Sequence, residues 1–388
     1  MSKTIEIKKP EIIKQENGKV RLVTNIIKDD KFKELWVEAD SEFEKYMVTE
    51  NCDAALCFFF VMAMRRGYDI VCEAPVSERL LFNLHEMAKV AYKYTKDLHL
   101  PKIQAKVCQN LKNEGAVVTS GSLGVNSFYA IDKFIDTPYS SLKLTHLWHN
   151  DVLEFSELKN HHINQGKRAE QAQQFSDVAK AVQRENLKKV AKELGVIPCF
   201  FDTNIATISS NTIQYNFFAN NCFVGYSFAK LFGTIIVPSK FSIASFGIKH
   251  IFRWDNGYHE LLNLSMLSSV DSNGGIRFIG DTFVYDRLDK IKVLADNHLV
   301  RQYLNVCLAT KDGTACNLCS KCKRTLIMLD YLDKLDNFAA VFDIEYYKNN
   351  FEKSYKPFLT DGINLKMILN YDLDKYQKLL DTLIKKHN

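Results

Sequence analysis

The sequence predicts an α/β protein built on a parallel sheet. From Gly115 onward, short apolar runs rich in β-branched residues alternate with amphipathic segments of helical length. The run 116–119, Ala-Val-Val-Thr, has the composition of an inner parallel strand, which is covered on both faces. Gly195 and Gly233 each separate a helical segment from a following strand. Strands and helices in this alternation form right-handed parallel units.

The individual elements of this α/β segment follow from the same periodicities. Runs with strand character stand between glycine-containing turns. The strands are expected at 116–119, 142–147, 196–201 and 234–237. The helices are expected at 127–135, 166–194 and 220–232.

The first 110 residues have a different, α+β pattern. Residues 20–24 and 35–39 alternate as half-buried strands do, with turn signals on either side. Residues 53–66 are apolar nearly all round and end at Gly67, which predicts a buried helix, and 77–96 predicts a second one. The segment after Asp271 is expected to be helical. The chain is therefore expected to have three parts, at residues 1–110, 111–270 and 271–388.

Composition favours a soluble protein of the cytosol. Of the 388 residues, 46% are hydrophobic and 25% charged, and the net charge is +5. Basic and acidic residues are interleaved, so we do not expect nucleic-acid binding. The first ten residues contain no apolar run that would suggest an export signal, and the longest apolar stretch, 54–64, is far shorter than a membrane span. We therefore expect a cytoplasmic chain whose ten cysteines meet a reducing environment.

Four cysteines near the C-terminal end have the spacing of a metal site. Cys307, Cys316, Cys319 and Cys322 form the pattern C-x8-C-x2-C-x2-C. Four thiolates are the ligand set of a closed, tetrahedral structural zinc site. Gly313 and Asn317 would give the connecting turns their backbone freedom. The alternatives are an iron–sulfur cluster, free core thiols or disulfides.

Several neighbouring or isolated residues allow a functional interpretation. Lys321, Lys323 and Arg324 would either offset the negative charge of the thiolates or reach a phosphate. His146, His149 and Asp151 could line a pocket, and a second metal site there is the weaker interpretation. The other six cysteines lie mostly in apolar surroundings and are expected to be unreactive core thiols. They are Cys52, Cys57, Cys72, Cys108, Cys199 and Cys222.

A small-residue turn follows the first strand of the α/β segment. Residues 119–129 read Thr-Ser-Gly-Ser-Leu-Gly-Val-Asn-Ser-Phe-Tyr. A glycine- and serine-rich turn between a strand and a helix directs N–H groups and a helix N-terminus at one point, which suits a phosphate. It is not a Walker loop, because no Gly-Lys-Ser/Thr follows. The alternative is an ordinary strand–helix turn.

Together, the loop and the cysteines resemble one enzyme family. The Ser-x-Gly-Val-x-Ser run at 122–127 resembles the SGGxDS pyrophosphate loop of the N-type ATP pyrophosphatases. The four-cysteine pattern resembles the zinc site of one branch, the 7-cyano-7-deazaguanine synthases. The run 321–325, Lys-Cys-Lys-Arg-Thr, is similar to the Lys-Cys-x-Arg-Thr ending of uncharacterised relatives. The resemblance extends from about residue 115 to 329 and leaves the N-terminal part unmatched.

The resemblance implies a nucleotide α-hydrolase fold, of Rossmann type, that cleaves ATP between its α- and β-phosphates. A carboxylate or amide oxygen would be adenylylated, and a nucleophile such as ammonia would displace AMP. Zinc would clamp the chain beside the acceptor pocket, and Mg2+ would accompany ATP. The implied nucleotide-binding residues are Ser120, Gly121, Ser122, Gly124, Asn126, Ser127 and His146, and the implied catalytic residues are Asn126 and Ser127.

The chain departs from the family pattern inside the loop. Leu123 stands where the family has its first glycine, and Asn126 stands where it has aspartate, which removes a charge that could hold Mg2+. Asn263 stands at a second position where relatives carry aspartate. Two hypotheses follow. The first is an ATP-dependent ligase acting on a small molecule or peptide. The second is a non-catalytic, zinc-containing scaffold subunit, as a homodimer or beside an active paralogue.

Overall fold

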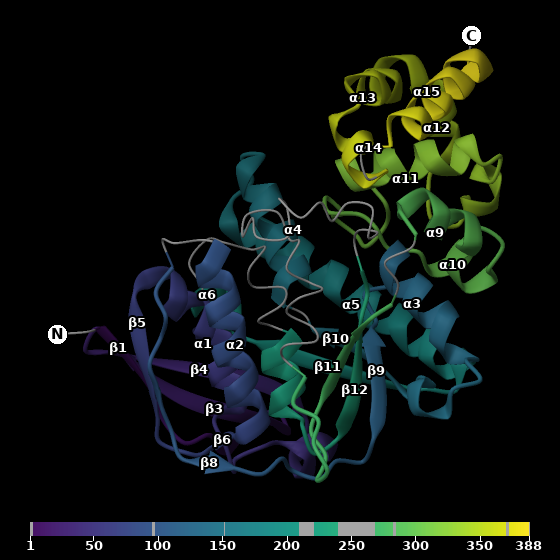
Figure 1. Cartoon of the computed structure of the whole chain (residues 1–388). Helices are drawn as coiled ribbons and strands as arrows, with labels where there is room; N and C mark the ends of the chain where they lie inside the picture. Colours follow the sequence, from purple (N-terminus) through teal and green to yellow (C-terminus); the bar gives the residue numbers. More distant parts are fainter. Residues whose placement is uncertain are drawn as a thin grey trace.

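A computed structural model gives the arrangement of the chain (Figure 1). It describes residues 3–94, 98–150, 152–208, 221–239, 268–281, 285–369 and 372–387. Within these ranges, 11 strands form one mixed sheet with helices on both of its faces. The α/β class and the mostly parallel arrangement predicted for the central strands are both confirmed.

The parallel part of the sheet consists of five strands. They are β9 (Ala116–Ser120), β10 (His146–Asn150), β11 (Ile197–Thr203), β12 (Phe232–Val237) and β13 (Arg277–Gly280). Their spatial order is β13-β12-β9-β10-β11, and every neighbouring pair is parallel. The chain therefore proceeds from β9 in one direction and later returns to its other side with β12. In open α/β sheets, ligands bind beyond the carboxyl ends of the strands at such a reversal point.

Two predictions for these strands were wrong. The strand expected at 142–147 begins four residues later, at His146, because Ser140–Leu142 form a 3-10 turn that brings the chain back from the preceding helix. The strand β13 was not predicted, since the segment after Asp271 was expected to be helical. Asn263 lies outside the described residues, as does Asp151.

The N-terminal strands continue the same sheet. They are β1 (Lys3–Ile7), β2 (Glu11–Lys14), β3 (Lys19–Lys28), β4 (Lys31–Asp40), β5 (Tyr68–Cys72) and β7 (Ile103–Gln104). The junction is an antiparallel pairing of β11 with β4, in which Asp202 lies opposite Glu38 and Thr203 opposite Val37. Two short strands, β6 (Val76–Ser77) and β8 (Val107–Cys108), form a separate parallel pair. The boundary expected near residue 110 thus interrupts neither the sheet nor its packing.

Helices cover each face of the sheet and create two cores. On one face, α1 (Asp53–Arg66) and α2 (Glu78–Tyr94) pack over the strands, together with the helical residues 221–227, and we call this the first core. On the other face lie α3 (Val125–Ile135) and α5 (Ala169–Leu194), in the second core. Alternate strand residues enter the two cores: Val118 enters the first and Val117 the second.

Two further helices of the described N-terminal residues are α4 (Val152–Asn164) and the short α6 (Ile205–Ile208). The helix predicted at 53–66 matches α1, which ends where Gly67 adopts a left-handed conformation with φ of 73°. The helix predicted at 166–194 begins three residues later, and Gly195 ends it at φ of 67°. A glycine is favoured at both positions because it has no Cβ.

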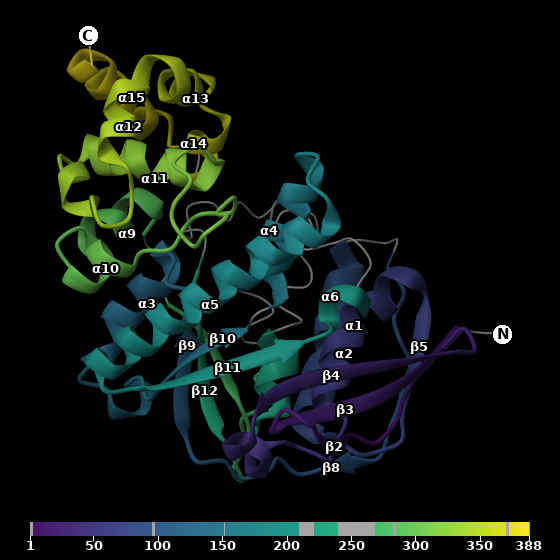
Figure 2. The same ribbon diagram turned by 180° about the vertical axis from the view of Figure 1, so that it is seen from behind.

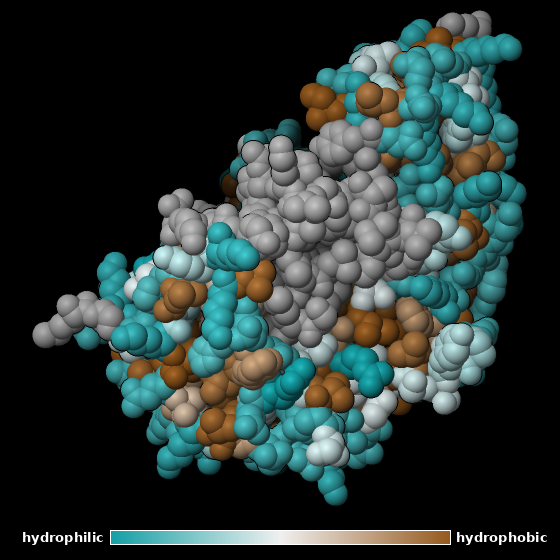
Figure 3. All heavy atoms as spheres, in the orientation of Figure 1, coloured by the Kyte–Doolittle hydropathy of each residue, from teal (hydrophilic) through white to brown (hydrophobic). Residues whose placement is uncertain are grey.

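The C-terminal helices extend the second core. They are α9 (Arg287–Leu294), α10 (His298–Tyr303), α11 (Ser320–Tyr331), α12 (Ile344–Asn349), α13 (Lys356–Asp361), α14 (Ile363–Ile368) and α15 (Leu373–His387). Both ribbon views place them beyond the edge at which the parallel strands end (Figures 1 and 2). On the face drawn in Figure 3, their outer surface is largely hydrophilic, because their apolar side chains turn inward. Within the described ranges, no helix has both the length and the apolar character needed to cross a bilayer.

Candidate metal centre and anion loop

The four cysteines come together at the start of α11. Cys307 follows α10, Cys316 lies in the loop before α11, Cys319 is the N-cap of α11, and Cys322 is in its first turn. Their sulfur atoms all lie within 4.8 Å of one another, and all four cysteines are free thiols. This is the predicted set, and we call it the metal centre.

The turns between the cysteines have the expected backbone freedom. Gly313 has a φ of 91° and Asn317 a φ of 58°, both in the left-handed region. Asn317 is also held by its neighbours, since its side-chain amide donates to the Asp343 carbonyl at 2.6 Å. The Tyr355 hydroxyl donates to the Asn317 carbonyl at 2.9 Å. The C-terminal helices thereby fix the conformation of the cysteine loop.

Hydrogen bonds among the four thiols divide them into two that hold their protons and two that release them. Hydrogen bonding with Cys316 raises the pKa of Cys307, and hydrogen bonding with Cys307 raises the pKa of Cys322. The backbone N–H groups of Ala309 and Cys316 both donate to Cys307 Sγ at 3.3 Å, and the N–H of Cys319 donates to Cys316 Sγ at 3.3 Å. Hydrogen bonding from Cys307 lowers the pKa of Cys316 to about 7, and it also lowers the pKa of Cys319. Amide donors and shared protons are the features of a site that releases its protons to a soft divalent metal. Four convergent sulfurs of this kind fit zinc.

The turn after β9, residues 120–127, is the second candidate site, and we call it the anion loop. Its backbone is tightly packed at Gly121, whose N–H donates to the Trp148 carbonyl at 2.6 Å. A Cβ at Gly121 would lie 2.6 Å from a methyl group of Leu187 on α5 and 3.2 Å from the Trp148 carbonyl. A larger residue would therefore displace the loop from the sheet.

Leu123 keeps the conformation that glycine would favour. Its φ is 56°, although it carries a side chain, and that side chain is completely buried in the second core. Its carbonyl accepts a hydrogen bond from the Asn305 N–H at 2.8 Å. Burial of the leucine side chain compensates the backbone strain of about 1 kcal/mol that a left-handed non-glycine residue carries.

The polar groups of the anion loop are arranged around the start of α3. The hydroxyls of Ser122 and Ser127 lie 2.7 Å apart, and the Ser120 hydroxyl accepts from the Ser122 N–H at 3.3 Å. Gly124 is the N-cap of α3 and supplies no side-chain cap. The first N–H groups of α3 therefore lack a capping side chain, and the helix dipole adds positive potential there. This arrangement fits a phosphate.

Asn126 Oδ1 is a buried acceptor at the same helix end. It has no solvent contact and no hydrogen-bond donor within the described ranges. The amide oxygen of Asn150, at the end of β10, is also buried and has no hydrogen-bond donor among the described residues. Buried polar atoms are seldom left unpaired, so an ordered water or a ligand would complete the hydrogen bonding of both amide oxygens.

His146 is not near the anion loop. Because β10 starts later than predicted, His146 is the first residue of that strand and lies opposite Val118, two residues before Ser120. Its ring contacts Phe232, and burial lowers its pKa. The residue opposite Ser120 is Trp148, and the strand ends at Asn150. The sequence predicted the His146 ring at the carboxyl end of its strand, whereas in the structure His146 is at the amino end of β10.

A cavity of about 250 Å³ lies beside the metal centre, and two of its wall residues hold the anion loop by hydrogen bonds. It lies between α5 and the segment 302–315, and Cys307 and Lys321 contribute to its wall. Gln183, also in the wall, donates to the Ser122 carbonyl at 2.9 Å, and the wall residue Asn305 binds Leu123 as described. No sequence pattern distinguishes Gln183 or Asn305, because a single polar residue in an amphipathic helix or a loop is common.

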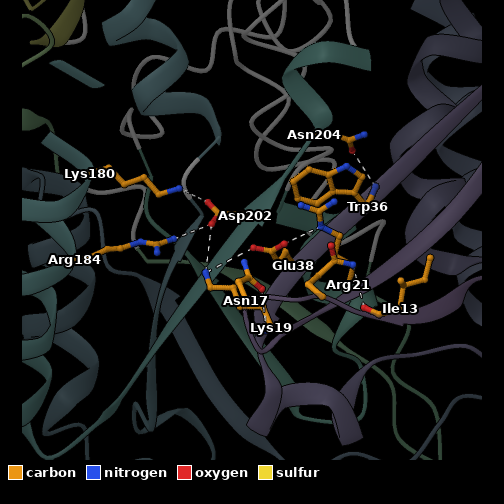
Figure 4. Close-up of polar contacts among 11 residues, drawn as sticks. Ile13, Asn17, Lys19, Arg21, Trp36, Glu38, Lys180, Arg184, Asp202 and Asn204 are labelled. Carbon is orange, nitrogen blue, oxygen red and sulfur yellow. Dashed lines mark hydrogen bonds and ion pairs between the residues drawn. The ribbon is translucent and has the colours of Figure 1, made fainter. Parts of the chain in front are cut away.

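Two further charged residues have structural partners of their own. Lys323 lies over the rings of Tyr355 at 5.9 Å and Phe358 at 5.8 Å, which directs it away from the anion loop. Asp202, at the end of β11, binds Lys180 at 2.5 Å and Arg184 at 3.1 Å, both from α5 (Figure 4). Asp202 is therefore part of the junction between α5 and the sheet.

No family model, curated protein or solved structure matches this chain. The residues of the two sites and of the neighbouring cavity are therefore what indicates a function.

Proposed function

We propose that this chain binds ATP at the anion loop and acts as an ATP-dependent, AMP-forming synthetase or ligase. The observation that carries the proposal is the position and make-up of that loop. It follows the strand at which the order of the parallel sheet reverses, and it combines an uncapped helix N-terminus with the paired hydroxyls of Ser122 and Ser127. Nucleotide phosphates bind at such places in open α/β sheets.

The residues of the loop would stabilise negative charge on a departing pyrophosphate. ATP, when bound with Mg2+, would supply the adenylyl group that activates an acceptor oxygen. The N–H groups at the start of α3 and the hydroxyls of Ser122 and Ser127 would donate to phosphate oxygens. Asn126 Oδ1, which has no donor within the described ranges, would accept from the ligand or coordinate the cation. Gln183 holds the loop carbonyl in place from the cavity wall.

The cavity would hold the acceptor, and the metal centre would act as a clamp. Asn305 and Lys321 place an amide and an ammonium group in the cavity wall beside Cys307. Cys307, Cys316, Cys319 and Cys322 would hold Zn2+, leaving no open coordination position, so the metal would serve structure and not chemistry. Because Cys307 lines the cavity, a metal bound to it would also hold that part of the cavity wall in place.

The first experiment measures ATP binding by calorimetry and pyrophosphate release with Mg2+. We expect the double variant Ser122→Ala/Ser127→Ala to bind ATP on the order of tenfold more weakly, because two charge-assisted hydrogen bonds are lost. Ser140→Ala, at an exposed serine in the turn before β10, is the matched control and should bind ATP as the unaltered chain does. Unchanged ATP affinity in the double variant would exclude the anion loop as the nucleotide site.

One observation favours a second function, a non-catalytic scaffold of the same fold. Asn126 is a neutral amide at the position where a carboxylate would hold Mg2+. In this case the unaltered chain binds ATP without releasing pyrophosphate, and Asn126→Asp restores release. If the unaltered chain releases pyrophosphate and Asn126→Asp leaves the rate within twofold, the scaffold function is excluded.

A further inference from the structure

Two buried arginines lie on adjacent helices without an ionic partner. Arg287 is the first residue of α9, and Arg324 lies in the second turn of α11, which packs against α9. Each is only 8% exposed. The Nε atom of each has no solvent contact and no hydrogen-bond acceptor within the described ranges. Neither guanidinium forms an ion pair with a carboxylate in that part of the chain.

Burial of these two guanidiniums is energetically unfavourable unless a negatively charged or polar group binds beside them. Arginine does not lose its proton in proteins, so the energetic cost of burying its charge cannot be avoided by deprotonation. A buried charge without a partner strongly destabilises a fold. The other buried cation of α9 shows the usual solution: Lys290 is 1% exposed and binds Asp281 Oδ2 at 3.0 Å and the Ser239 carbonyl at 2.6 Å.

The charges around the two arginines differ. Arg324 lies near the thiols of Cys319 and Cys322, so a loaded metal centre would offset its charge. Arg287 has no such neighbour, and the charged group that acts on it is Arg324 itself. The metal centre therefore accounts for one arginine and leaves the other uncompensated. The pair as a whole lacks at least one negative charge.

We propose that Arg287 and Arg324 form a binding site for a phosphoryl group. The guanidiniums of Arg287 and Arg324 act on each other electrostatically, and each offers a phosphate a planar, forked set of donors. The positive charge that the metal centre leaves uncompensated favours an anion. The site is beside the region already described, because α9 packs against α3, which starts at the anion loop. Arg324 also follows Lys321, which lines the cavity, by three residues, so both lie on one face of α11.

A phosphoryl site at Arg287 and Arg324 requires no ATP cleavage, but its role in a synthetase rests on the proposed function. If the phosphoryl group belongs to the ligand of the cavity, the acceptor is a phosphorylated small molecule. If it belongs to the nucleotide, the arginines extend the ATP site beyond the anion loop. The shared chemistry is a phosphoryl dianion, and the experiment separates the two sources.

The test uses the metal-loaded full chain and inorganic phosphate. Melting temperature is measured in phosphate-free buffer and over a phosphate titration, with calorimetry for affinity. We expect saturable stabilisation of the unaltered chain, because phosphate would bind the folded state alone. Arg287→Met should weaken phosphate binding on the order of tenfold, since a charged bidentate partner is lost. In phosphate-free buffer the same variant should melt no lower than the unaltered chain, because an unpaired buried charge has been removed.

Arg301→Met is the matched control. Arg301 lies on α10 and binds Asp296 at 2.5 Å and the Ala295 carbonyl at 2.9 Å, so its charge is already paired. Its replacement should leave the phosphate response unchanged. If Arg287→Met does not fold, Arg287→Lys keeps the charge without the fork and should show a reduced but measurable response.

Three results would overturn the inference. One is the absence of saturable phosphate binding by the unaltered chain, which would mean that water satisfies the arginines. Another is an equal loss of melting temperature in Arg287→Met with and without phosphate, which indicates a packing role. The third is a response abolished by Ser122→Ala/Ser127→Ala and kept by Arg287→Met, which supports the anion loop alone. Persistence of the response in the serine double variant, with loss in Arg287→Met, supports a phosphate site separate from ATP.

Discussion

Two groups of cysteines in this chain share one side chain but differ in what sets the pKa values of their thiols. Five cysteines lie inside the first core, at positions Cys52, Cys57, Cys72, Cys199 and Cys222. Complete burial raises the pKa of Cys57 and of Cys222 well above the usual value, so both remain protonated. In the metal centre, the pKa of Cys316 is lowered to about 7. The lowering does not extend to every thiol of the metal centre, since hydrogen bonding with Cys307 raises the pKa of the fully buried Cys322.

The difference comes from the backbone and from the number of sulfurs. In the metal centre, left-handed turns at Gly313 and Asn317 direct N–H groups at sulfur, and four sulfurs share one space. In the first core the nearest equivalent is one pair, in which a hydrogen bond with Cys72 lowers the pKa of Cys52. Two sulfurs are too few for a closed tetrahedral site. Local spacing, and not the abundance of cysteine, therefore decides which thiols are placed so that they could hold a metal.

The largest effect is expected from removing a metal ligand. Cys319→Ser should lose one equivalent of bound zinc and with it the ordered loop that joins α10, α11 and α12. Structural zinc sites contribute on the order of 10 kcal/mol of apparent binding free energy at neutral pH, so the C-terminal helices should lose protection. Metal analysis and hydrogen exchange measure the two effects. A full equivalent of zinc with unchanged exchange in this variant would contradict the metal centre.

The metal centre is also the feature that the sequence predicted most completely. Its four ligands and both turn residues lie within 16 positions, so the pattern is local. Helix α1 was predicted to its last residue for the same reason, since an apolar run ends at Gly67. The strand predicted at 142–147 was placed four residues too early. The alternation of apolar and polar residues continues into Trp148, and such a pattern does not show at which residue a strand begins.

Other features depend on contacts between distant residues and have no local pattern. The pairing of β4 with β11 joins Val37 to Thr203 and makes one sheet of two segments that were expected to be separate. The cavity wall combines Gln183 with Asn305. The unpaired state of Arg287 depends on which acids fail to reach it, and that is a property of the fold alone.

A smaller effect should show that the first core excludes charge as well as metal. Asp53, at the start of α1, is buried among these cysteines, and burial raises its pKa to about 6 although Ser77 donates to it. A raised carboxyl pKa means that the folded state binds the proton more tightly than the unfolded state. Stability is therefore greatest below the unfolded pKa near 4 and falls as pH rises towards 6. A shift of two units corresponds to about 3 kcal/mol.

Asp53→Asn should remove that dependence. The amide has no charge at any pH, and its oxygen and nitrogen can keep the bonds to the Ser77 N–H, at 2.8 Å, and hydroxyl, at 2.5 Å. Relative to the unaltered chain, the variant should be nearly equal in stability at pH 4 and more stable by about 3 kcal/mol above pH 6.5. Chemical denaturation at several pH values measures the difference. A difference that is constant across this range would mean that the pKa of Asp53 is the same in the folded and unfolded states, which would contradict the prediction.

The smallest effect is expected from a core cysteine. Cys199 lies on β11, is completely buried in the first core, and has its pKa raised by burial. Cys199→Ala removes one sulfur from this packing and should cost about 1–2 kcal/mol, in the range of small core truncations. Because the lost atom has no role in the metal centre, the variant should keep a full equivalent of zinc.

Cys199→Ser makes the comparison stricter, because serine has nearly the same size and adds a stronger polar group. With no partner for its hydroxyl among apolar neighbours, it should be less stable than Cys199→Ala by about 1 kcal/mol or more. In the metal centre, the effect of replacing a cysteine depends on the loss of a metal ligand. In the first core, it depends on the cost of burying the new side chain. Loss of zinc from either Cys199 variant, with the fold otherwise retained, would show that the two groups of cysteines are coupled across the sheet.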